Sequence, residues 1–332
     1  MLKVLLTVDT EVWPWSPGWP HAALPAGKDC SRELACYLWG GEGARRYGIP
    51  YQLDILEQFG LKGTFFVEPL FSYALGLEPL RLLVSTIVSR GQEIGLHLHP
   101  EWLNDARARG LPPFKGPSLW HYGDAEQDTL VRMGLERLRE AGSSDVRAFR
   151  AGSFAAALST PAVLARNGLV FDSSLNACYA ESFPGLQSKD TMLQPVALDG
   201  IWEVPVTHFV DRPPTGRRPL QVCACSLGEF RTVLDRAADA GWSVAVIVSH
   251  SFEFVRVDRG RAGRPATPQR LLARRFEALC GHLASRRSRY ETCHFSDLDS
   301  PAALARVDAT PIRSGRVRTT LRHFEQLASR LY

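Results

Sequence analysis

Short apolar segments alternate with longer amphipathic ones along this chain, and this alternation constrains its fold more than any other feature. The apolar segments, of which 2–8, 63–67 and 243–248 are the clearest, have the length and composition of buried strands. Strands that alternate with helices form a parallel sheet with right-handed crossovers. About seven such units over residues 1–298 therefore predict an α/β fold, a closed or nearly closed (β/α) barrel.

The bounds of the predicted elements are set by glycines and prolines and by the points where the spacing of apolar residues changes between that of a strand and that of a helix. A C-terminal extension, residues 299–332, contains an amphipathic helix that we expect to pack on the barrel. We expect the other helices at 51–59, 79–90, 125–141, 161–168, 227–240 and 268–285, and strands at 2–8, 63–67, 93–99, 149–151, 169–171, 201–209, 243–248 and 290–295.

Ionisable residues stand at the ends of the predicted strands. In a barrel of parallel strands the C-terminal ends meet at one mouth, where the chemistry of such barrels lies. Residues scattered independently would not fall there so regularly, so we expect their side chains to converge. They are Asp9, Glu11, His97, His99, Arg150, Asp172 and His250.

Two histidines, His97 and His99, end the predicted strand that begins near Glu93. Side chains alternate between the faces of a strand, so both imidazoles project to the same side. Two imidazoles that converge at a strand end form half of a metal site. A pair of surface histidines beside the turn at Pro100 is the alternative interpretation of the same pattern.

A long loop, residues 12–48, follows the first predicted strand. Loops of this length are usually functional or disordered, and the tryptophans argue against disorder. They are Trp13, Trp15, Trp19 and Trp39.

Composition excludes several classes of protein. The chain has 332 residues, 45% of them hydrophobic and 22% charged, with a formal net charge of +4, and its arginines are scattered, which does not argue for nucleic-acid binding. We expect a cytoplasmic protein, because the N-terminal apolar run is too short for a signal peptide and no stretch approaches a membrane span of about 18 residues.

The seven cysteines do not have the spacing of a disulfide framework, and we interpret Cys223 and Cys225 as core thiols.

Five short motifs, in this order, resemble those of polysaccharide deacetylases of the NodB-homology type, which is carbohydrate esterase family 4. Residues 63–67 (Gly-Thr-Phe-Phe-Val) also resemble the Ala-Thr-Phe-Phe-Val of that family. The resemblance covers about residues 1–298 and implies a distorted (β/α) barrel of a divergent branch. The motifs are Thr7-Val8-Asp9-Thr10-Glu11, Gln92-Glu93-Ile94-Gly95-Leu96-His97, Phe149-Arg150-Ala151-Gly152, Phe171-Asp172-Ser173-Ser174 and Ile247-Val248-Ser249-His250.

The sequence departs from the family pattern at the metal ligands. Thr10 stands where the family has its metal-binding aspartate, and a hydroxyl is a poor replacement for a carboxylate. Either Glu11 reaches the ion in its place or Asp9 binds it. The histidines are spaced i, i+2 instead of i, i+4, so His99 is either the second ligand or only a neighbour, and Glu101 is a further candidate carboxylate.

The resemblance implies a hydrolase that removes an N-acyl group, acetyl or formyl, from an amino sugar or glycan precursor. It implies a divalent ion, zinc first and nickel, cobalt or manganese as alternatives, held by Glu11, His97 and His99. The implied catalytic residues are Asp9 as the general base, Arg150 as the group that orients it and His250 as the general acid. The implied substrate-binding residues are Trp13, Trp102 and Asp172.

Each candidate also has a purely structural interpretation. Asp9 could cap a helix, Arg150 could make a structural ion pair, and Asp172 before two serines could belong to a turn. The loop tryptophans could pack only on the barrel. A non-catalytic glycan- or ligand-binding barrel that lost the metal at Thr10 is therefore the alternative function, and a serine hydrolase is disfavoured because the G-x-S-x-G elbow is missing.

Overall fold

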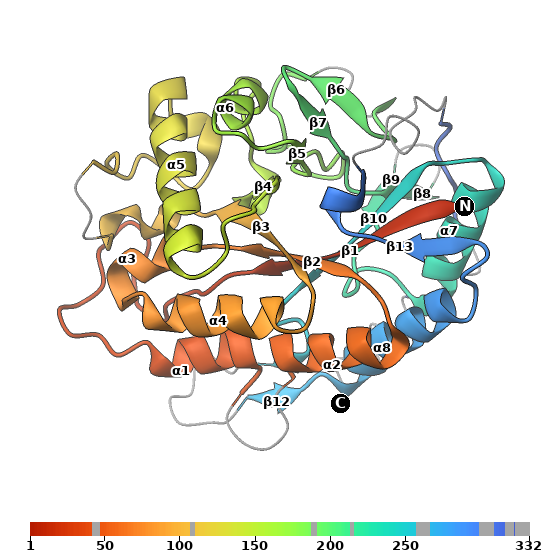
Figure 1. Cartoon of the computed structure of the whole chain (residues 1–332), viewed down its shortest axis with the longest axis horizontal. Helices are drawn as coiled ribbons and strands as arrows, with labels where there is room; N and C mark the ends of the chain where they lie inside the picture. The colour runs from red at the N-terminus through yellow and green to blue at the C-terminus, as the bar shows by residue number, and fades with distance from the viewer. Residues whose placement is uncertain are drawn as a thin grey trace.

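The computed structural model describes residues 1–41, 47–106, 110–186, 191–212, 216–256, 266–298, 309–315 and 322. A curled, mainly parallel sheet forms its centre (Figure 1), with strands in the order β10-β1-β2-β3-β4-β5-β7-β6 and β13 beside β1. Among the described strands of this sheet, β6 alone runs antiparallel to its neighbour. The strands are β1 (Leu2–Thr10), β2 (Gly63–Val67), β3 (Glu93–Leu98), β4 (Ala148–Ala151), β5 (Phe171–Asp172), β6 (Val196–Leu198), β7 (Ile201–Glu203), β10 (Val244–His250) and β13 (Tyr290–Thr292).

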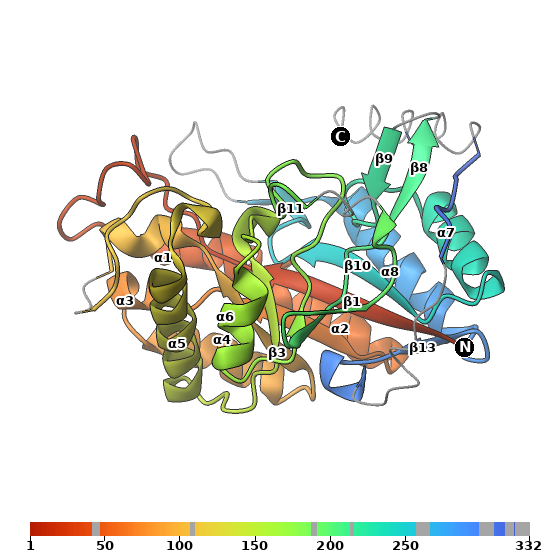
Figure 2. The same ribbon diagram turned by 90° about the horizontal axis from the view of Figure 1, so that it is seen from above.

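This sheet confirms the predicted parallel barrel of about seven strands. One predicted strand, residues 201–209, is wrong in extent, because the structure divides it between β7 and β8 (His208–Arg212). Pro205 lies between the two and has no N–H to donate to a ladder, so the strand ends before it. β8 pairs instead with β9 (Gly216–Pro219) in a separate hairpin (Figure 2).

The helices lie on the outer side of the curled sheet (Figure 1). The longer ones begin and end within a few residues of the predicted positions. They are α2 (Ile49–Phe59), α4 (Glu78–Val88), α5 (Asp124–Glu140), α6 (Thr160–Arg166), α7 (Leu227–Asp239) and α8 (Arg270–Ala284). The remaining short elements are α1 (Ser31–Leu34), η1 (Ala35–Trp39), α3 (Phe71–Leu75), η2 (Pro100–Asn104), η3 (Leu119–His121), η4 (Gly152–Phe154), η6 (Phe295–Leu298), β11 (Val255–Arg256) and β12 (Thr267–Pro268).

The two faces of β1 serve different purposes. Val4, Leu6 and Val8 belong to the large apolar core that also includes residues of the outer helices. Leu5 belongs to a second, smaller core, which contains Phe66 of β2. Because side chains alternate along a strand, the residues that follow Leu5 on its own face are Thr7 and then Asp9. The polar side chains therefore lie at the C-terminal end of the strand, next to the apolar side chains that fill the inside of the curled sheet.

Irregular backbone bridges the curled sheet beside β10. The amide of Val222 donates to the carbonyl of Val248 at 2.9 Å, and the amide of Val248 donates to Leu220 at 3.0 Å. Leu220 in turn donates to Thr207 at 2.7 Å. Residues 220–222 thus hydrogen-bond to the outer edge of β10 without forming a regular strand there.

The predicted C-terminal helix lies mostly outside the described residues, so the division at residue 299 stays a prediction. Residues 309–315 run beside β8, where the amide of Val210 donates to Ile312 at 2.8 Å. Arg322 is fully buried and forms ion pairs with Glu229 at 2.6 Å and Asp211 at 3.0 Å. No helix within the described part of the chain has the length and apolarity to cross a membrane.

Replacement of Arg322 by alanine is expected to destabilise the fold by about 3–5 kcal/mol, because it leaves the buried carboxylate of Glu229 without its cation and takes from Asp211 one of its two arginine partners, the other being Arg218. Urea unfolding measures the change. Arg286→Ala is the control, since Arg286 pairs with Asp235 at the surface, and its loss should cost at most about 1 kcal/mol. Equal effects of the two substitutions would contradict the anchoring role of Arg322.

Candidate active site

Three side chains from the ends of two strands, β1 and β3, converge on one point at the mouth of the curl. Glu11 Oε2 lies 2.5 Å from His99 Nε2 and 3.8 Å from His97 Nε2, and the two Nε2 atoms are 3.1 Å apart. All three residues are buried. For ligands bound at about 2.0–2.1 Å, the edge of a coordination tetrahedron is about 3.3 Å, and the three separations scatter around this value. Glu11, His97 and His99 together form a group able to hold a metal ion.

The hydrogen bonds of the two imidazoles test whether a cation fits. His97 Nδ1 donates to the carbonyl of Arg150 at 2.7 Å, and His99 Nδ1 donates to the carboxylate of Glu101 at 3.2 Å. A neutral imidazole that donates from Nδ1 carries a lone pair on Nε2. The two Nε2 lone pairs therefore face each other beside a carboxylate, which is stable only with a cation or proton between them. Such Nδ1 partners are typical of metal-binding histidines, so the donor set fits a metal ion.

The charges around the three groups also favour a cation. Burial raises the pKa of Glu11, but the charge of His99 and hydrogen bonds with His97 and His99 outweigh it and hold this pKa well below its usual value. Burial lowers the pKa of His99, but the charges of Glu101 and Glu11 raise it well above its usual value. The protein thus surrounds this point with negative charge.

Strand alternation explains why Glu11 and not Thr10 joins the histidines. Thr10 lies on the face of β1 opposite Asp9, and its hydroxyl donates to the carbonyl of Val8 at 3.3 Å. Glu11, two residues after Asp9, returns to the inner face. The sequence offers two candidates for the carboxylate ligand, Asp9 and Glu11, and Glu11 is the one that contacts His99.

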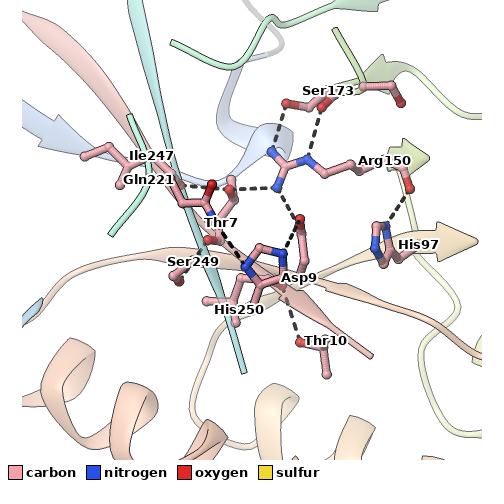
Figure 3. A network of polar contacts seen from close by, with 12 residues as sticks. Thr7, Asp9, Thr10, His97, Arg150, Ser173, Gln221, Ile247, Ser249 and His250 are labelled. Carbon is pink, nitrogen blue, oxygen red and sulfur yellow. Dashed lines mark hydrogen bonds and ion pairs between the residues drawn. The ribbon is translucent and has the colours of Figure 1, made fainter. Parts of the chain in front are cut away.

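Asp9 is held by a buried arginine (Figure 3). Nη1 of Arg150 donates to Asp9 Oδ1 at 2.6 Å and to the hydroxyl of Thr7 at 2.9 Å. Its other nitrogens donate to the backbone carbonyl and the hydroxyl of Ser173, both at 3.0 Å, and its guanidinium lies over the ring of Phe66 at 4.3 Å. Every nitrogen of the guanidinium is therefore engaged, and Arg150 fixes Asp9 so that Oδ2 faces the mouth.

His250 completes the set from β10, where it is paired in register with Asp9 of β1. Its Nε2 lies 3.9 Å from both Asp9 Oδ2 and Glu11 Oε1, while Nδ1 donates to Glu253 Oε1 at 2.9 Å. Burial lowers the pKa of His250, but the hydrogen bond and charge of Glu253, together with Asp9 and Glu11, raise it to about 9. The imidazole is thus held in the protonated form at neutral pH.

Glu253 and Gln221 are not among the residues that the sequence motifs indicated, and no motif assigned Glu101 the role that it has here. Gln221 Nε2 donates to Glu253 Oε1 at 3.0 Å and so braces the partner of His250. Glu253 follows His250 by three residues, a spacing that could have suggested the contact. Gln221 is remote in sequence and reaches the site through the bridge beside β10, which no local pattern indicates.

The three predicted substrate-binding residues lie in different surroundings, and their role stays a prediction. Trp13 is partly exposed, and its ring lies edge-on to His99 with centroids 4.6 Å apart. Trp102 is fully buried behind Trp19. Asp172 is fully buried, accepts hydrogen bonds from the amide and hydroxyl of Ser174, and has a pKa that burial raises to about 6. Only Trp13 borders the mouth.

A cavity of about 730 Å³ is lined in part by Trp13 and Glu101, both of which contact His99. Its walls come mainly from the loop after β1. The residues that line it are Trp13, Pro14, Trp15, Ser16, Pro17, Trp19, Pro20, His21, Glu101, Pro117 and Phe252. It therefore leads from the tryptophan-rich loop directly to Glu101, the partner of His99.

Comparison with solved structures shows that this chain has a known fold. A proposed polysaccharide deacetylase from Mycobacterium smegmatis superposes with a TM-score of 0.57 at 20% sequence identity, over 95% of this chain and 94% of that one. The chain shares the fold of that protein. No family model matches the sequence, and no curated protein matches it.

Two more distant structures were also found. One is a family 4 carbohydrate esterase from Streptomyces lividans in complex with acetate, at 14% identity and a TM-score of 0.43, over 93% of this chain and 97% of that one. The other is a family 4 pseudoenzyme from Bacillus anthracis, at 13% identity and a TM-score of 0.39, over 94% of this chain and 69% of that one.

Gly152 allows the close approach of His99. A Cβ at this position would lie 2.6 Å from Cε1 and Nδ1 of the imidazole and 2.6 Å from the carbonyl oxygen of Leu98. Gly152→Ala is therefore expected to displace the ring from Glu101 and to weaken metal binding about 10- to 100-fold, as loss of a ligand's partner does. Competition against a chromogenic chelator measures the affinity.

Gly315→Ala is the control for this substitution, because a Cβ there meets nothing within 4 Å. It should bind metal like the wild type. Unchanged affinity in Gly152→Ala would show that His99 does not need its present position to bind the ion.

Proposed function

We propose that this protein is a metal-dependent hydrolase that removes an N-acyl group, acetyl or formyl, from an amino sugar or glycan precursor. The observation that carries the proposal is the pair of imidazole Nε2 atoms 3.1 Å apart beside Glu11, next to Asp9 and His250. The fold shared with a proposed deacetylase supports it.

Glu11, His97 and His99 would hold the ion. Two imidazoles and one carboxylate suit zinc first, with nickel, cobalt and manganese as alternatives. When bound, such an ion polarises the acyl carbonyl and lowers the pKa of water.

Asp9 is the proposed general base. Arg150 occupies Oδ1, which leaves Oδ2 directed at the mouth to accept the proton of the attacking water. Thr7 and Ser173 fix the guanidinium in turn, so the carboxylate needs no rearrangement before it acts.

His250 is the proposed general acid. Glu253 accepts the hydrogen bond from Nδ1, so the proton on Nε2 faces the centre of the site. As the C–N bond breaks, this proton goes to the departing amine nitrogen. The tautomer and the orientation of the ring both depend on Glu253.

A non-catalytic barrel remains the second candidate, because Thr10 replaces the carboxylate of the family pattern. Glu11 lies on the inner face of the sheet, whereas Thr10 lies on the opposite face, and Glu11 contacts His99. This contact favours the catalytic function over the non-catalytic one.

Metal content tests the proposal first. Protein purified without chelator is expected to carry one divalent ion per chain, and both His97→Ala and Glu11→Ala should lose it while they keep their circular dichroism spectrum, because each substitution removes one of three ligands. Elemental analysis by plasma mass spectrometry gives the count. His121→Ala is the control, since His121 stacks on exposed Trp120 and does not belong to the group of candidate ligands. Full occupancy in Glu11→Ala would transfer the carboxylate role to Asp9.

The proton donor is tested by leaving group and by pH. His250→Ala should slow hydrolysis of an N-acetyl amide about 100-fold or more and slow an activated ester much less, because a good leaving group needs no proton. Equal losses on both substrates would make His250 a positioning residue. Wild-type activity should be present below the pKa of His250, about 9, and should fall as pH rises through it.

Glu253→Gln separates the charge of Glu253 from its hydrogen bond, since the amide oxygen can still accept from Nδ1. Loss of the negative charge lowers the pKa of His250, so the alkaline limb of the rate profile should move to lower pH. An unmoved limb would show that Glu253 does not tune the acid.

A further inference from the structure

Two fully buried carboxyl groups lie on neighbouring strands of the curled sheet. Asp172 ends β5 and Glu203 ends β7, and the two residues are paired in register. The side chains of this carboxyl pair, Asp172 and Glu203, are within hydrogen-bond reach of each other. A carboxylate can only accept a hydrogen bond, so two carboxyl groups can bond to each other only if a proton lies between them.

The donors around the carboxyl pair leave one oxygen of each group without a partner. The amide and the hydroxyl of Ser174 donate to Asp172 Oδ1, and the amide of Leu175 donates to Glu203 Oε1 at 3.1 Å. Within the described part of the chain, no N–H or O–H group donates to Asp172 Oδ2 or to Glu203 Oε2. An unpaired carboxylate oxygen is costly to bury, whereas one proton held between Oδ2 and Oε2 satisfies both oxygens.

Burial favours retention of this proton. It raises the pKa of Glu203 well above its usual value, and the charge of Asp172 raises that pKa further. The amide of Leu175 and the charge of Arg150 act in the opposite sense and are outweighed. When two carboxyl groups share a buried site, one of them keeps its proton, because adjacent negative charges repel each other strongly where water is absent.

The carboxyl pair holds the turn that follows β5, and this turn presents Ser173 to the candidate active site. The pair accepts hydrogen bonds from the two amides that follow Ser173. The hydroxyl of Ser173 donates to the carbonyl of Val204, the residue after Glu203, at 2.9 Å. The carbonyl and the hydroxyl of Ser173 each accept a hydrogen bond from Arg150, both at 3.0 Å (Figure 3). The place of the guanidinium therefore depends on this turn.

We propose that Glu203 is a positioning residue, which shares one proton with Asp172 and, through Ser173 and Arg150, orients the proposed base Asp9. The inference rests on the proposed deacylase function and adds to it a residue outside the candidate ligands and the proposed acid and base. The last step of the path is the hydrogen bond from Arg150 to Asp9 Oδ1 at 2.6 Å. Without the shared proton a second buried negative charge would lie near Arg150, where it would compete with Asp9 for the guanidinium.

The shared proton is tested at neutral pH by carbon-13 NMR of protein labelled at the carboxyl carbons of aspartate and glutamate. Glu203→Gln and Asp172→Asn assign the two signals by removing them. We expect the signal of Glu203 at the position of a protonated carboxyl group. Glu68 should give another such signal, which stays in both variants, because burial raises its pKa to about 8. Ionised signals for both Glu203 and Asp172 would overturn the proposal.

Glu203→Ala tests the positioning. With the metal-loaded protein and N-acetylglucosamine as substrate, it should lower kcat for release of acetate about 10- to 100-fold with little change in KM, because a displaced base loses its alignment. Glu203→Gln should restore most of kcat, because its amide can donate to Asp172 Oδ2 as the shared proton does. Wild-type kcat in folded Glu203→Ala, or an equal loss in Glu203→Gln, would overturn the proposal.

Glu229→Ala is the matched control, since Glu229 is also a fully buried glutamate but pairs with Arg322. It should lower the thermal stability and leave kcat of the folded protein unchanged. An equal loss of kcat in this control would show that the effect of Glu203→Ala comes only from lower stability. If alanine at position 203 prevents folding, Glu203→Met, which is closer in volume to glutamate and also has no donor, takes its place.

Failure of the deacylase proposal can be told apart from failure of this one. If no substrate releases acetate, the carbon-13 signals still report the shared proton and the path to Asp9. The carboxyl signal of Asp9, assigned by Asp9→Asn, should move in Glu203→Ala and stay in place in Glu203→Gln. An unmoved Asp9 signal in folded Glu203→Ala would refute the positioning role. Release of acetate by a wild type in which both Glu203 and Asp172 are ionised would refute this inference and leave the deacylase function in place.

Discussion

The site depends on the hydrogen bonds that one buried group, the guanidinium of Arg150, donates to its neighbours. It binds Asp9 and Thr7 of β1 and Ser173 beyond β5, so one side chain joins three strands of the curl. The carbonyl of the same residue accepts the hydrogen bond of His97. The proposed base and one proposed metal ligand are therefore fixed by a single residue, by its side chain and its backbone respectively. Burying such a charge is costly unless every donor has a partner, and here each nitrogen has one.

Much of this arrangement could be predicted from the sequence because it depends on periodicity. Parallel strands with alternating side chains place Asp9, His97, Arg150 and His250 at one mouth, and the structure confirms that they lie together. The same rule explains the exchange of Thr10 for Glu11. The break at Pro205 was also readable in principle, because proline cannot continue a ladder.

The remaining features depend on contacts that no local pattern encodes. Gln221 reaches His250 through an irregular bridge between strand edges, and Gly152 is needed because the ring of a distant histidine passes over it. The role of Asp172 as a substrate-binding residue stays a prediction. It stands at a strand end, is fully buried and accepts from the hydroxyl of Ser174, which in turn accepts from the amide of Ala151. A position at a strand end predicts where a residue lies, but it does not predict from which donors its carboxylate oxygens accept hydrogen bonds.

One short segment has several duties at once. Asp9, Glu11, Trp13 and Trp15 are alternate residues: the first two belong to the candidate active site, and the last two line the cavity beside it. Insertion or deletion of one residue between Glu11 and Trp13 would turn the tryptophans away from the mouth while the carboxylates kept their places. The proposed catalytic half of this segment and the half that lines the cavity are thus separated by one position, and under the proposed function a change of length there offers an evolutionary route to new substrates with the chemistry retained.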